Sequence, residues 1–225
     1  MRRLVIASMA FAVSMAPGTA VEAEEGLTAA GAFSPAGSLA EARLQHTATL
    51  LPDGRVLVIG GMDGQRFNTL AEVWDPATAT FAPAGSAAEG HVEHTATLLA
   101  DGRVLVVGGA PTSAWVEIWD PATETFGPKV PLAEARSGHT ATLLPDGRIL
   151  VIGGWDGTQY RATAEIWDPA TETFGPAGSL AQVRQKHTAT LLPDGRVLVV
   201  GGWDTGPVRG KGTLASAEVW RPSDR

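Results

Sequence analysis

Four histidines recur along the chain, each followed at fixed distances by an aspartate, an arginine and a pair of glycines. The first opens the phrase HTATLLPDGRVLVIGG at residues 46–61, and near-identical phrases occupy residues 94–109, 139–154 and 187–202. Histidine and aspartate serve in acid–base catalysis, and histidines converging on one axis would suit a metal ion. However, thirteen of the sixteen positions are identical in all four copies. Catalytic sites are normally asymmetric, so one hydrogen bond made four times explains these histidines more economically.

Other catalytic patterns are missing from the sequence. Cysteine is absent, Tyr160 is the one tyrosine, and neither a P-loop nor an HExxH motif occurs. Asp156 and Asp204 would suit a glycosidase if they faced one cleft, although only their presence supports that interpretation. We therefore expect no catalytic residue, no metal and no cofactor, with a carbohydrate-active enzyme as the alternative.

The composition indicates a folded domain that does not bind polyanions. Hydrophobic residues make up 44% of the 225 residues and charged residues 18%, which leaves enough apolar surface for a core. The formal net charge is -7, and no cluster of lysine and arginine marks a basic face. We therefore expect neither nucleic acid nor an anionic membrane as the main partner. Without cysteine, stability must come from packing rather than from disulfides.

The first twenty residues differ in kind from the rest. Two arginines precede an apolar run at residues 4–16, which is short for a bilayer span, and small residues follow. This order is typical of a secretory signal peptide. We expect residues 1–20 to be cleaved after Ala20, rather than after Ala23 or retained as an amphiphilic anchor. The mature chain would be secreted, extracellular or periplasmic, without membrane insertion, and residues 21–32 would be a short lead to one domain at 33–225.

The repeat itself predicts the fold. Successive repeated histidines are 48, 45 and 48 residues apart, and each unit reads as four short strands. HTATLL alternates polar and apolar residues, and the apolar run RVLVVGG follows it after a PDG turn. AEVWDP and TFGPAGSL supply the third and fourth strands, divided by another turn. A unit of ~45–50 residues with four strands is a blade of a β-propeller, so we expect an all-β chain of four blades with four antiparallel strands each.

The two ends of the repeat predict how the propeller closes. Residues 33–39, FSPAGSL, match the fourth-strand sequence FGPAGSL at 174–180, and they precede the first full copy. The last copy stops after a third strand that finishes at Trp220. We therefore expect the N-terminal strand to complete the last blade and close a monomeric ring, which leaves no open edge. Association of two chains into a larger assembly is the alternative.

The glycine pairs and aromatic residues resemble the kelch motif. In that motif a glycine pair closes an apolar strand, an aromatic residue lies near the end of the third strand, and a second aromatic follows. Here these residues are Gly60-Gly61, Trp74 and Phe81; Gly108-Gly109, Trp119 and Phe126; Gly153-Gly154, Trp167 and Phe174; and Gly201-Gly202 and Trp220. The resemblance covers residues 33–222 and implies a kelch-type β-propeller. Kelch repeats usually have tyrosine and then tryptophan, whereas this chain has tryptophan and then phenylalanine, which alters packing detail alone.

The copies differ in length only in the segments after the glycine pairs. These segments contain ten, seven, ten and fifteen residues before the repeated glutamate. In an up-and-down sheet, these loops share one face of the ring with the connections between blades, and a binding surface need not repeat as scaffold must. We call this surface the variable face, and the opposite one, which carries the PDG and DPAT turns, the conserved face. The variable face is the predicted binding surface.

Aromatic and acidic residues on the variable face are the first candidates for ligand contacts. Trp155 and Trp203 directly follow a glycine pair, and Trp115 has no aromatic counterpart in the other copies. Exposed aromatic rings beside polar groups suit sugar rings or peptide side chains. The candidates are therefore Trp115, Trp155, Trp203, Tyr160, Asp156 and Asp204. The alternatives are that the tryptophans cover the ends of the core and that the aspartates only form turns.

Three arginines form a second candidate group, each three residues before a repeated histidine. They are Arg43, Arg136 and Arg184, and His91 takes this place in the second copy. Arg136-Ser137-Gly138 resembles the segment from which some kelch substrate adaptors direct arginines at acidic peptides, which implies a cationic ring that binds carboxylates or sulfates. The alternative is internal pairing with the repeated glutamates, Glu72, Glu117, Glu165 and Glu218.

Together these patterns favour a secreted, non-enzymatic module that binds a protein or a glycan through the variable face. Enzymatic kelch relatives such as galactose-oxidase-like proteins need a cysteine cross-linked to a tyrosine, and this chain has no cysteine. The runner-up remains a carbohydrate-active enzyme built on the same propeller.

Overall fold

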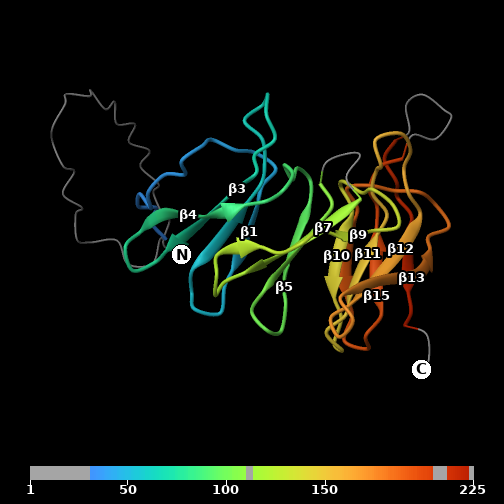
Figure 1. Ribbon diagram of the computed structural model, residues 1–225. Helices are drawn as coiled ribbons and strands as arrows, with labels where there is room; N and C mark the ends of the chain where they lie inside the picture. The colour runs from blue at the N-terminus through green and yellow to red at the C-terminus, as the bar shows by residue number, and fades with distance from the viewer. Residues whose placement is uncertain (1–30, 110–113, 205–211, 223–225) are drawn as a thin grey trace, which may run out of the picture. The chain divides into compact units, whose positions relative to one another are not determined.

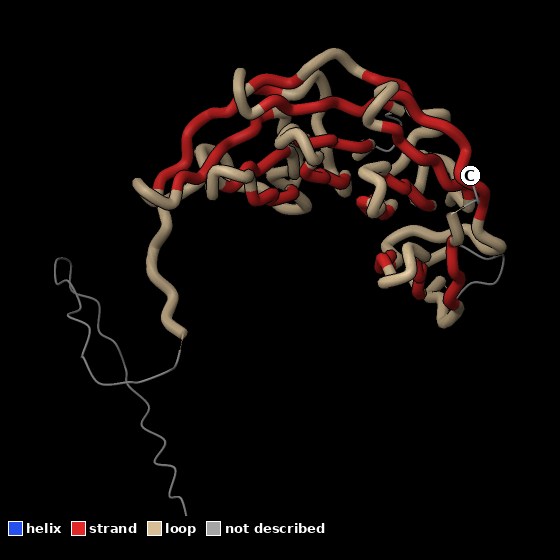
Figure 2. The backbone as a smooth tube through the Cα atoms, turned by 90° about the horizontal axis from the view of Figure 1, so that it is seen from below, coloured by secondary structure: helices blue, strands red, loops and turns tan. Residues whose placement is uncertain are grey.

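The structure is a computed structural model that describes residues 31–109, 114–204 and 212–222. Residues 36–225 form one compact unit, whereas residues 31–35 belong to a separate unit and form no strand. The described part of the chain holds no helix long and apolar enough to cross a membrane, and Figure 2 shows strands and loops throughout it. The predicted signal peptide, residues 1–20, lies outside the described residues, as does most of the predicted lead.

The described strands form four antiparallel sheets that follow one another along the chain (Figure 1). The first sheet contains β1 (Thr47–Leu50), β2 (Val56–Ile59), β3 (Leu70–Asp75) and β4 (Thr80–Ser86). The second contains β5 (Thr95–Leu98), β6 (Val104–Val107), β7 (Trp115–Asp120), β8 (Thr125–Phe126) and β9 (Val130–Pro131). The third contains β10 (Thr140–Leu143), β11 (Ile149–Ile152), β12 (Thr163–Asp168) and β13 (Thr173–Ser179). The fourth contains β14 (Thr188–Leu191), β15 (Val197–Val200) and β16 (Ala217–Trp220).

The aspartate and arginine of the repeated phrase hold the turn between the first two strands of each sheet. Oδ1 of Asp53 accepts a hydrogen bond from the backbone N–H of Arg55 at 3.0 Å, and Oδ2 pairs with Nε of Arg55 at 2.7 Å. Gly54 between them has φ 89°, a left-handed conformation that glycine tolerates. The same contacts recur in the pairs Asp101–Arg103, Asp146–Arg148 and Asp194–Arg196. These residues are therefore structural.

The glycine pairs let neighbouring sheets approach each other closely. A Cβ atom at Gly60 would lie 2.4 Å from the carbonyl oxygen of His91, and one at Gly61 would lie 2.7 Å from the carbonyl oxygen of Leu44. Both distances are shorter than van der Waals contact allows. The backbone N–H of Gly61 in turn donates to the carbonyl oxygen of His91 at 2.7 Å. Glycine is thus required at both positions because another piece of backbone passes there.

The hydrophobic core lies between consecutive sheets. The second strand of each sheet is apolar along its whole length, and β6 and β11 are buried at every residue because they are covered on both faces. Leu57 and Ile59 of the first sheet pack in one cluster with Trp119 of the second. Trp167 and Trp220 take the same place in the clusters of the next two junctions. The third-strand tryptophans of the second, third and fourth sheets therefore pack against the sheet before them.

The outer strand of the second sheet is interrupted. The first and third sheets have continuous outer strands, β4 and β13, whereas the sequence FGPKVPL at residues 126–132 forms the two short strands β8 and β9. Pro131 replaces the serine found in the other copies and has no N–H to donate to the ladder. The two-part outer strand is a departure from the four regular strands expected for this unit.

Ring closure is not among the strand pairings of the described residues. The fourth sheet has the order β14-β15-β16, and the outer edge of β16 pairs with no described strand. Residues 33–39, which we expected to complete this sheet, form no strand. Instead, the carbonyl oxygen of Ala36 accepts a hydrogen bond from the indole N–H of Trp74 in the first sheet at 2.9 Å. The all-β architecture of four antiparallel sheets is observed, and the closed ring stays a prediction.

Candidate ligand-binding face

Three of the four repeated histidines bond to the preceding sheet. Nε2 of His94, His139 and His187 lies 2.8, 3.0 and 2.9 Å, respectively, from a threonine hydroxyl of that sheet. Burial, reinforced by neighbouring basic side chains, lowers the pKa of His94 and His139 to about 3 and that of His187 to about 4. Among the residues that the structure describes, no group of three or more His, Asp or Glu side chains could hold a metal ion. The repeated histidines therefore join sheets as neutral hydrogen-bonding groups.

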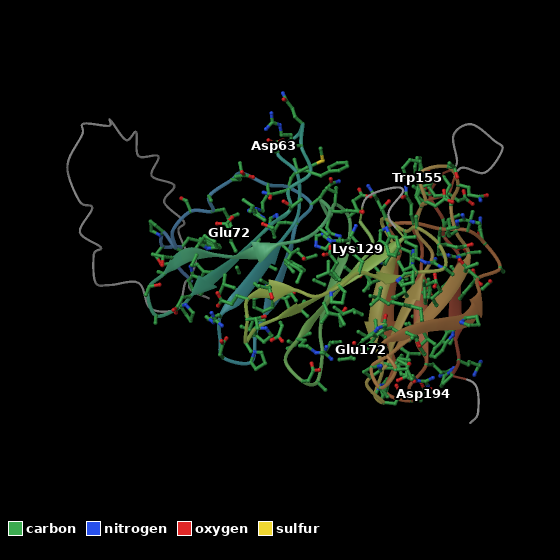
Figure 3. The ribbon with its side chains drawn as sticks, in the orientation of Figure 1. Asp63, Glu72, Lys129, Trp155, Glu172 and Asp194 are labelled. Carbon is green, nitrogen blue, oxygen red and sulfur yellow. The ribbon has the colours of Figure 1, made fainter. Side chains whose placement is uncertain are left out.

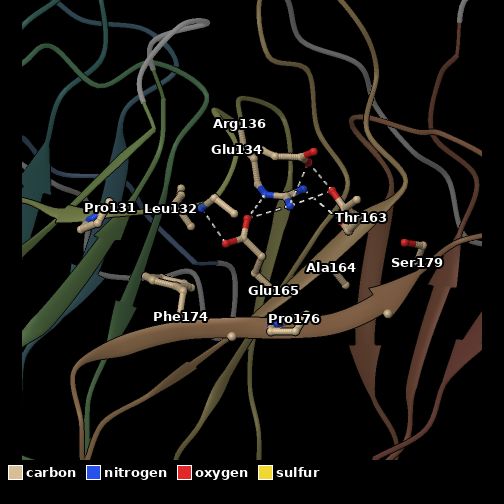
Figure 4. A pocket seen from close by; sticks show the side chains of 13 residues that line it. Pro131, Leu132, Glu134, Arg136, Thr163, Ala164, Glu165, Phe174, Pro176 and Ser179 are labelled. Carbon is tan, nitrogen blue, oxygen red and sulfur yellow. Dashed lines mark hydrogen bonds and ion pairs between the residues drawn. The ribbon is translucent and has the colours of Figure 1, made fainter.

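The three candidate arginines are buried in ion pairs. Nη2 and Nε of Arg136 bond to Oε1 of Glu165 at 2.8 and 3.1 Å (Figure 4). Nη1 donates to the carbonyl oxygens of Gly153 and Thr163 at 2.8 and 2.9 Å. The equivalent pairs in the first and fourth sheets are Arg43–Glu72 and Arg184–Glu218. All three guanidinium groups are fully buried. The internal pairing is thus the arrangement observed, and a cationic ring open to a ligand is not.

His91 takes the place of the arginine in the second sheet. Its Nε2 lies 2.9 Å from Oε2 of Glu117, and its Nδ1 lies 2.6 Å from the carbonyl oxygen of Gly108. Both residues of this pair are buried. The second sheet therefore keeps the buried contact between a basic side chain and the repeated glutamate, with a shorter side chain in place of arginine.

The residues after the glycine pairs form small strand-like extensions at the variable face. Isolated bridges join Met62 to Leu44 and to Phe67 on the first sheet. The equivalent bridges are Ser137–Trp155 and Trp155–Tyr160 on the third sheet, and Gln185–Trp203 and Trp203–Thr213 on the fourth. Figure 3 shows Asp63 and Trp155 at one end of the sheets and Glu172 and Asp194 at the other. The sequence-based division into a variable and a conserved face matches this arrangement.

Aromatic rings at these extensions are open to solvent. Trp203 is 41% exposed, and Tyr160 lies edge-on to it with ring centroids 5.7 Å apart. Phe67 is 48% exposed and occupies in the first copy the place that Tyr160 occupies in the third. Sequence reasoning brought forward the two tryptophans and the tyrosine but missed Phe67. Aligning the first and third copies residue by residue after the glycine pair is the signal that could have found it.

Trp115 differs from the other candidate aromatics in its surroundings. It begins β7, where it is paired with Pro131 of β9, and its ring is partly exposed. The ammonium group of Lys129 lies 5.6 Å from the ring centroid, which is within range of a cation–π contact. Trp115 therefore covers the interrupted outer edge of the second sheet while part of its ring remains open.

The two candidate aspartates are held by local contacts. Oδ1 of Asp156 accepts hydrogen bonds from the backbone N–H groups of Thr158 and Gln159, both at 2.7 Å, and Oδ2 pairs with Arg161. Burial opposes ionisation of this carboxyl group, but these contacts outweigh it and lower its pKa to about 2. Oδ2 of buried Asp204 accepts a hydrogen bond from Gln182 at 2.8 Å. Asp156 is therefore an ionised turn residue and is unsuited to the general-acid role of a glycosidase.

Two clefts border these features. One of about 500 Å³ lies at the variable face of the first sheet and is lined by Glu41, Asp63, Arg66, Phe67, Asn68 and Leu70, among others. A second, of about 570 Å³, lies between the second and third sheets, where Leu132, Phe174 and Pro176 form apolar walls (Figure 4). The charged groups of the second cleft are engaged with one another, as described for Arg136. The first cleft combines a half-exposed ring with charged groups, which suits ligand contact.

Tandem sheets of short antiparallel strands, joined through glycine pairs and buried tryptophans, define a propeller-like repeat protein. The kelch motif matches residues 44–86 and 135–180, which are the first sheet and the third. These two repeats are kelch motifs. A search of curated proteins finds no match to it.

Proposed function

We propose that this kelch-repeat protein is a binding module that takes a partner protein on its variable face. One observation carries the proposal: half-exposed apolar side chains gather at the extensions after the glycine pairs, where the repeats stop being alike. Phe67 and Trp203 are the most exposed of them, and Leu44, which bridges to Met62 of the first extension, is exposed as well. Exposed apolar groups beside charged ones mark interaction sites on soluble proteins. The proposal also requires the sheets to be held in a propeller-like arrangement, so that their variable-face loops share one surface.

The family supports a protein as the ligand. Kelch repeats generally mediate contacts between proteins rather than catalysis. A glycan is the other ligand class, and the edge-on pair of Tyr160 and Trp203 is the observation in its favour, because aromatic rings stack against sugar rings. Peptide and glycan arrays distinguish the two ligand classes.

Single substitutions on either face test the assignment. Phe67→Ala and Trp203→Ala should each weaken binding to the peptides that the unmodified protein selects from an array by at least about tenfold, with Tm unchanged. Leu50→Ala is the matched control, since Leu50 is 64% exposed but lies beside the turn of the conserved face. Binding to a glycan array but to no peptide array would identify the ligand as a carbohydrate and contradict a protein partner. An equal loss in the control, or no loss in either variant, would reject the variable face as the site.

We also propose that the chain is exported, because residues 1–20 have the order of charged, apolar and small residues that signal peptidases recognise. Expression in a secreting bacterial host should give a mature protein that begins at Val21. Mass spectrometry of the N-terminal peptide measures this directly. A chain that stays inside the cell with residues 1–20 attached would contradict the proposal.

A further inference from the structure

Each junction between consecutive sheets is made by the same set of contacts. A histidine of the later sheet bonds to a threonine of the earlier one, and a tryptophan of the later sheet fills the core between them. The second glycine of the earlier sheet donates its N–H to a carbonyl of the connection that enters the later sheet. These bonds are Gly61 to His91 at 2.7 Å, Gly109 to Arg136 at 2.9 Å and Gly154 to Arg184 at 2.8 Å. One interface is thus built three times within the chain.

The fourth sheet exposes the face that would make a further junction of this kind. Ile59, Val107 and Ile152 are at most 1% exposed because the following sheet covers them. Val200, the equivalent residue of the fourth sheet, is 41% exposed, and Val219 on the same face is 39% exposed. Thr188, the equivalent of the threonines that bond to histidine, is exposed as well. The fourth sheet therefore exposes the surface that belongs to the earlier sheet in each of the three junctions.

The first sheet carries the residues that the later sheet contributes to each of the three junctions. His46 is the equivalent of the buried His94, yet it is exposed. The indole of Trp74 and the carboxylate of Glu72 are already engaged by the chain's own N-terminal segment: the indole N–H donates to the carbonyl of Ala36 at 2.9 Å, and the N–H of Ala40 donates to Oε2 of Glu72 at 2.9 Å.

The second sheet contains the equivalents of those two contacts. There the indole N–H of Trp119 donates to the carbonyl of Ala84 at 2.9 Å, and the N–H of Ala88 donates to Oε1 of Glu117 at 3.0 Å. Ala84 belongs to β4, the outer strand of the preceding sheet. Residues 36–40 therefore occupy the place of an outer strand, and no described sheet pairs with them there.

The free edge of β16 fits residues 33–38 as its fourth strand. FSPAGSL at 33–39 differs from FGPAGSL at 174–180 at one position, and AEVW of β16 matches AEIW of β12. In the third sheet, Trp167 is opposite Phe174 and Ile166 is opposite Gly175. The same register would place Trp220 opposite Phe33 and Val219 opposite Ser34. Phe33 is fully exposed in the described chain, whereas Phe174 packs against the core.

We propose that a second copy of this chain supplies the missing junction. The fourth sheet of one copy packs on the first sheet of the other, β16 gains residues 33–38 of that copy, and Thr188 bonds to its His46. We choose a second copy because the face of the fourth sheet and His46 of the first sheet both stay uncovered within one chain, although its three internal junctions have formed. Each copy carries both of these surfaces. Two equivalent junctions therefore join two copies into a closed assembly. This inference concerns the faces between sheets and does not depend on the ligand-binding proposal.

Engineered disulfides test which chain supplies the strand, since the protein has no cysteine of its own. Ser34→Cys and Val219→Cys would be opposite each other in the proposed pairing, where Cα atoms lie about 5.5 Å apart, a distance that a disulfide spans. A mixture of the two single variants should oxidise to a covalent dimer on a non-reducing gel. Ser34→Cys mixed with Asp194→Cys, on the conserved face, should not. If the double variant oxidises within one chain and runs as a monomer, the strand comes from the same chain and the proposal is wrong.

The solution mass tests the junction itself. Light scattering on the unmodified chain should give the mass of two chains at micromolar concentration. Val200→Asp buries a charge in the junction and should raise the dimer Kd about 100-fold or more, with an unchanged circular dichroism spectrum. Leu143→Asp replaces an equally exposed apolar residue, 41% exposed and outside the junction, and should leave the mass unchanged. A chain that is monomeric at every concentration, or a dimer insensitive to Val200→Asp, would overturn the inference.

Discussion

Trp119 and Trp167 are equivalent residues of neighbouring sheets, and both are fully buried. Nε1 of Trp119 donates to the carbonyl oxygen of Ala84 at 2.9 Å, whereas Nε1 of Trp167 has no hydrogen-bond partner among the described residues. The difference follows from the outer strand that each ring faces, which is continuous in the first sheet and interrupted in the second. A buried donor without an acceptor costs about 1–3 kcal/mol. The packing of Trp167 therefore stabilises its junction, and the unsatisfied indole N–H offsets part of that stabilisation.

Phenylalanine substitutions separate these two contributions. Trp119→Phe removes a hydrogen bond and leaves the carbonyl of Ala84 unsatisfied, while Trp167→Phe removes an unsatisfied donor. Because both lose a similar apolar area, Trp119→Phe should lower the free energy of unfolding by about 1–3 kcal/mol more than Trp167→Phe. Urea unfolding of the two single variants measures the difference. Equal losses would show that the indole of Trp167 has an acceptor in solution.

Among the elements, the outer strands show how three residues change a strand. FGPAGSL forms the continuous β13, and FGPKVPL forms the interrupted pair β8 and β9. The triple variant Lys129→Ala, Val130→Gly, Pro131→Ser gives the second sheet the sequence of the third. It restores the N–H that proline lacks. It also places the carbonyl of residue 129 where it can accept a hydrogen bond from the indole of Trp167, as the carbonyl of Ala177 accepts one from Trp220 at 3.0 Å.

We expect this triple variant to form one continuous outer strand. Amide hydrogen exchange at residues 129–131 should slow, and the indole proton of Trp167 should become protected, both measured by NMR. Lys129→Ala alone retains Pro131 and serves as the control, with exchange as in the unmodified protein. Unchanged protection in the triple variant would place the cause of the interruption outside these three residues.

The sequence was sufficient for the strands and the turns because their signals are local. Alternation in HTATLL, the apolar run that follows and the Asp-Gly turn each depend on a few neighbouring residues. The orientation of Arg136 was open from sequence because a buried pair with Glu165 and a solvent-facing cation have the same spacing along the chain. Only the packing of one sheet against the next decides between them. The break between β8 and β9 had a readable signal in Pro131, since proline cannot donate to a ladder.

For the molecule as a whole, the buried histidines couple stability to pH. Their pKa values are depressed in the folded state, to about 3 for His94 and His139 and about 4 for His187, against about 6.5 in an unfolded chain. The stability they contribute is therefore fully present above pH 6.5 and is lost as pH falls toward 4, because the unfolded chain takes up the protons. At pH 5 each histidine should cost about 2 kcal/mol relative to pH 7.5.

Urea unfolding between pH 7.5 and pH 5 measures this loss. The unmodified protein, measured in the same buffers, provides the control. His139→Gln should make the slope shallower, whatever its effect on stability at pH 7.5. A free energy of unfolding that stays level down to pH 5 would show that these histidines take up protons in the fold as readily as in the unfolded chain.

The near identity of residues 33–39 and 174–180 also bears on the order in which the chain folds. Both segments suit the edge of β12, but 174–180 is joined to β12 by a short turn, and chain entropy favours the nearer strand. The local hairpin therefore forms first and leaves the N-terminal segment unable to compete for that edge. The free edge of β16 has no such near neighbour among the described residues. Its pairing is then the last step of folding, and with a second copy as the source it follows second-order kinetics, so that its rate rises with protein concentration.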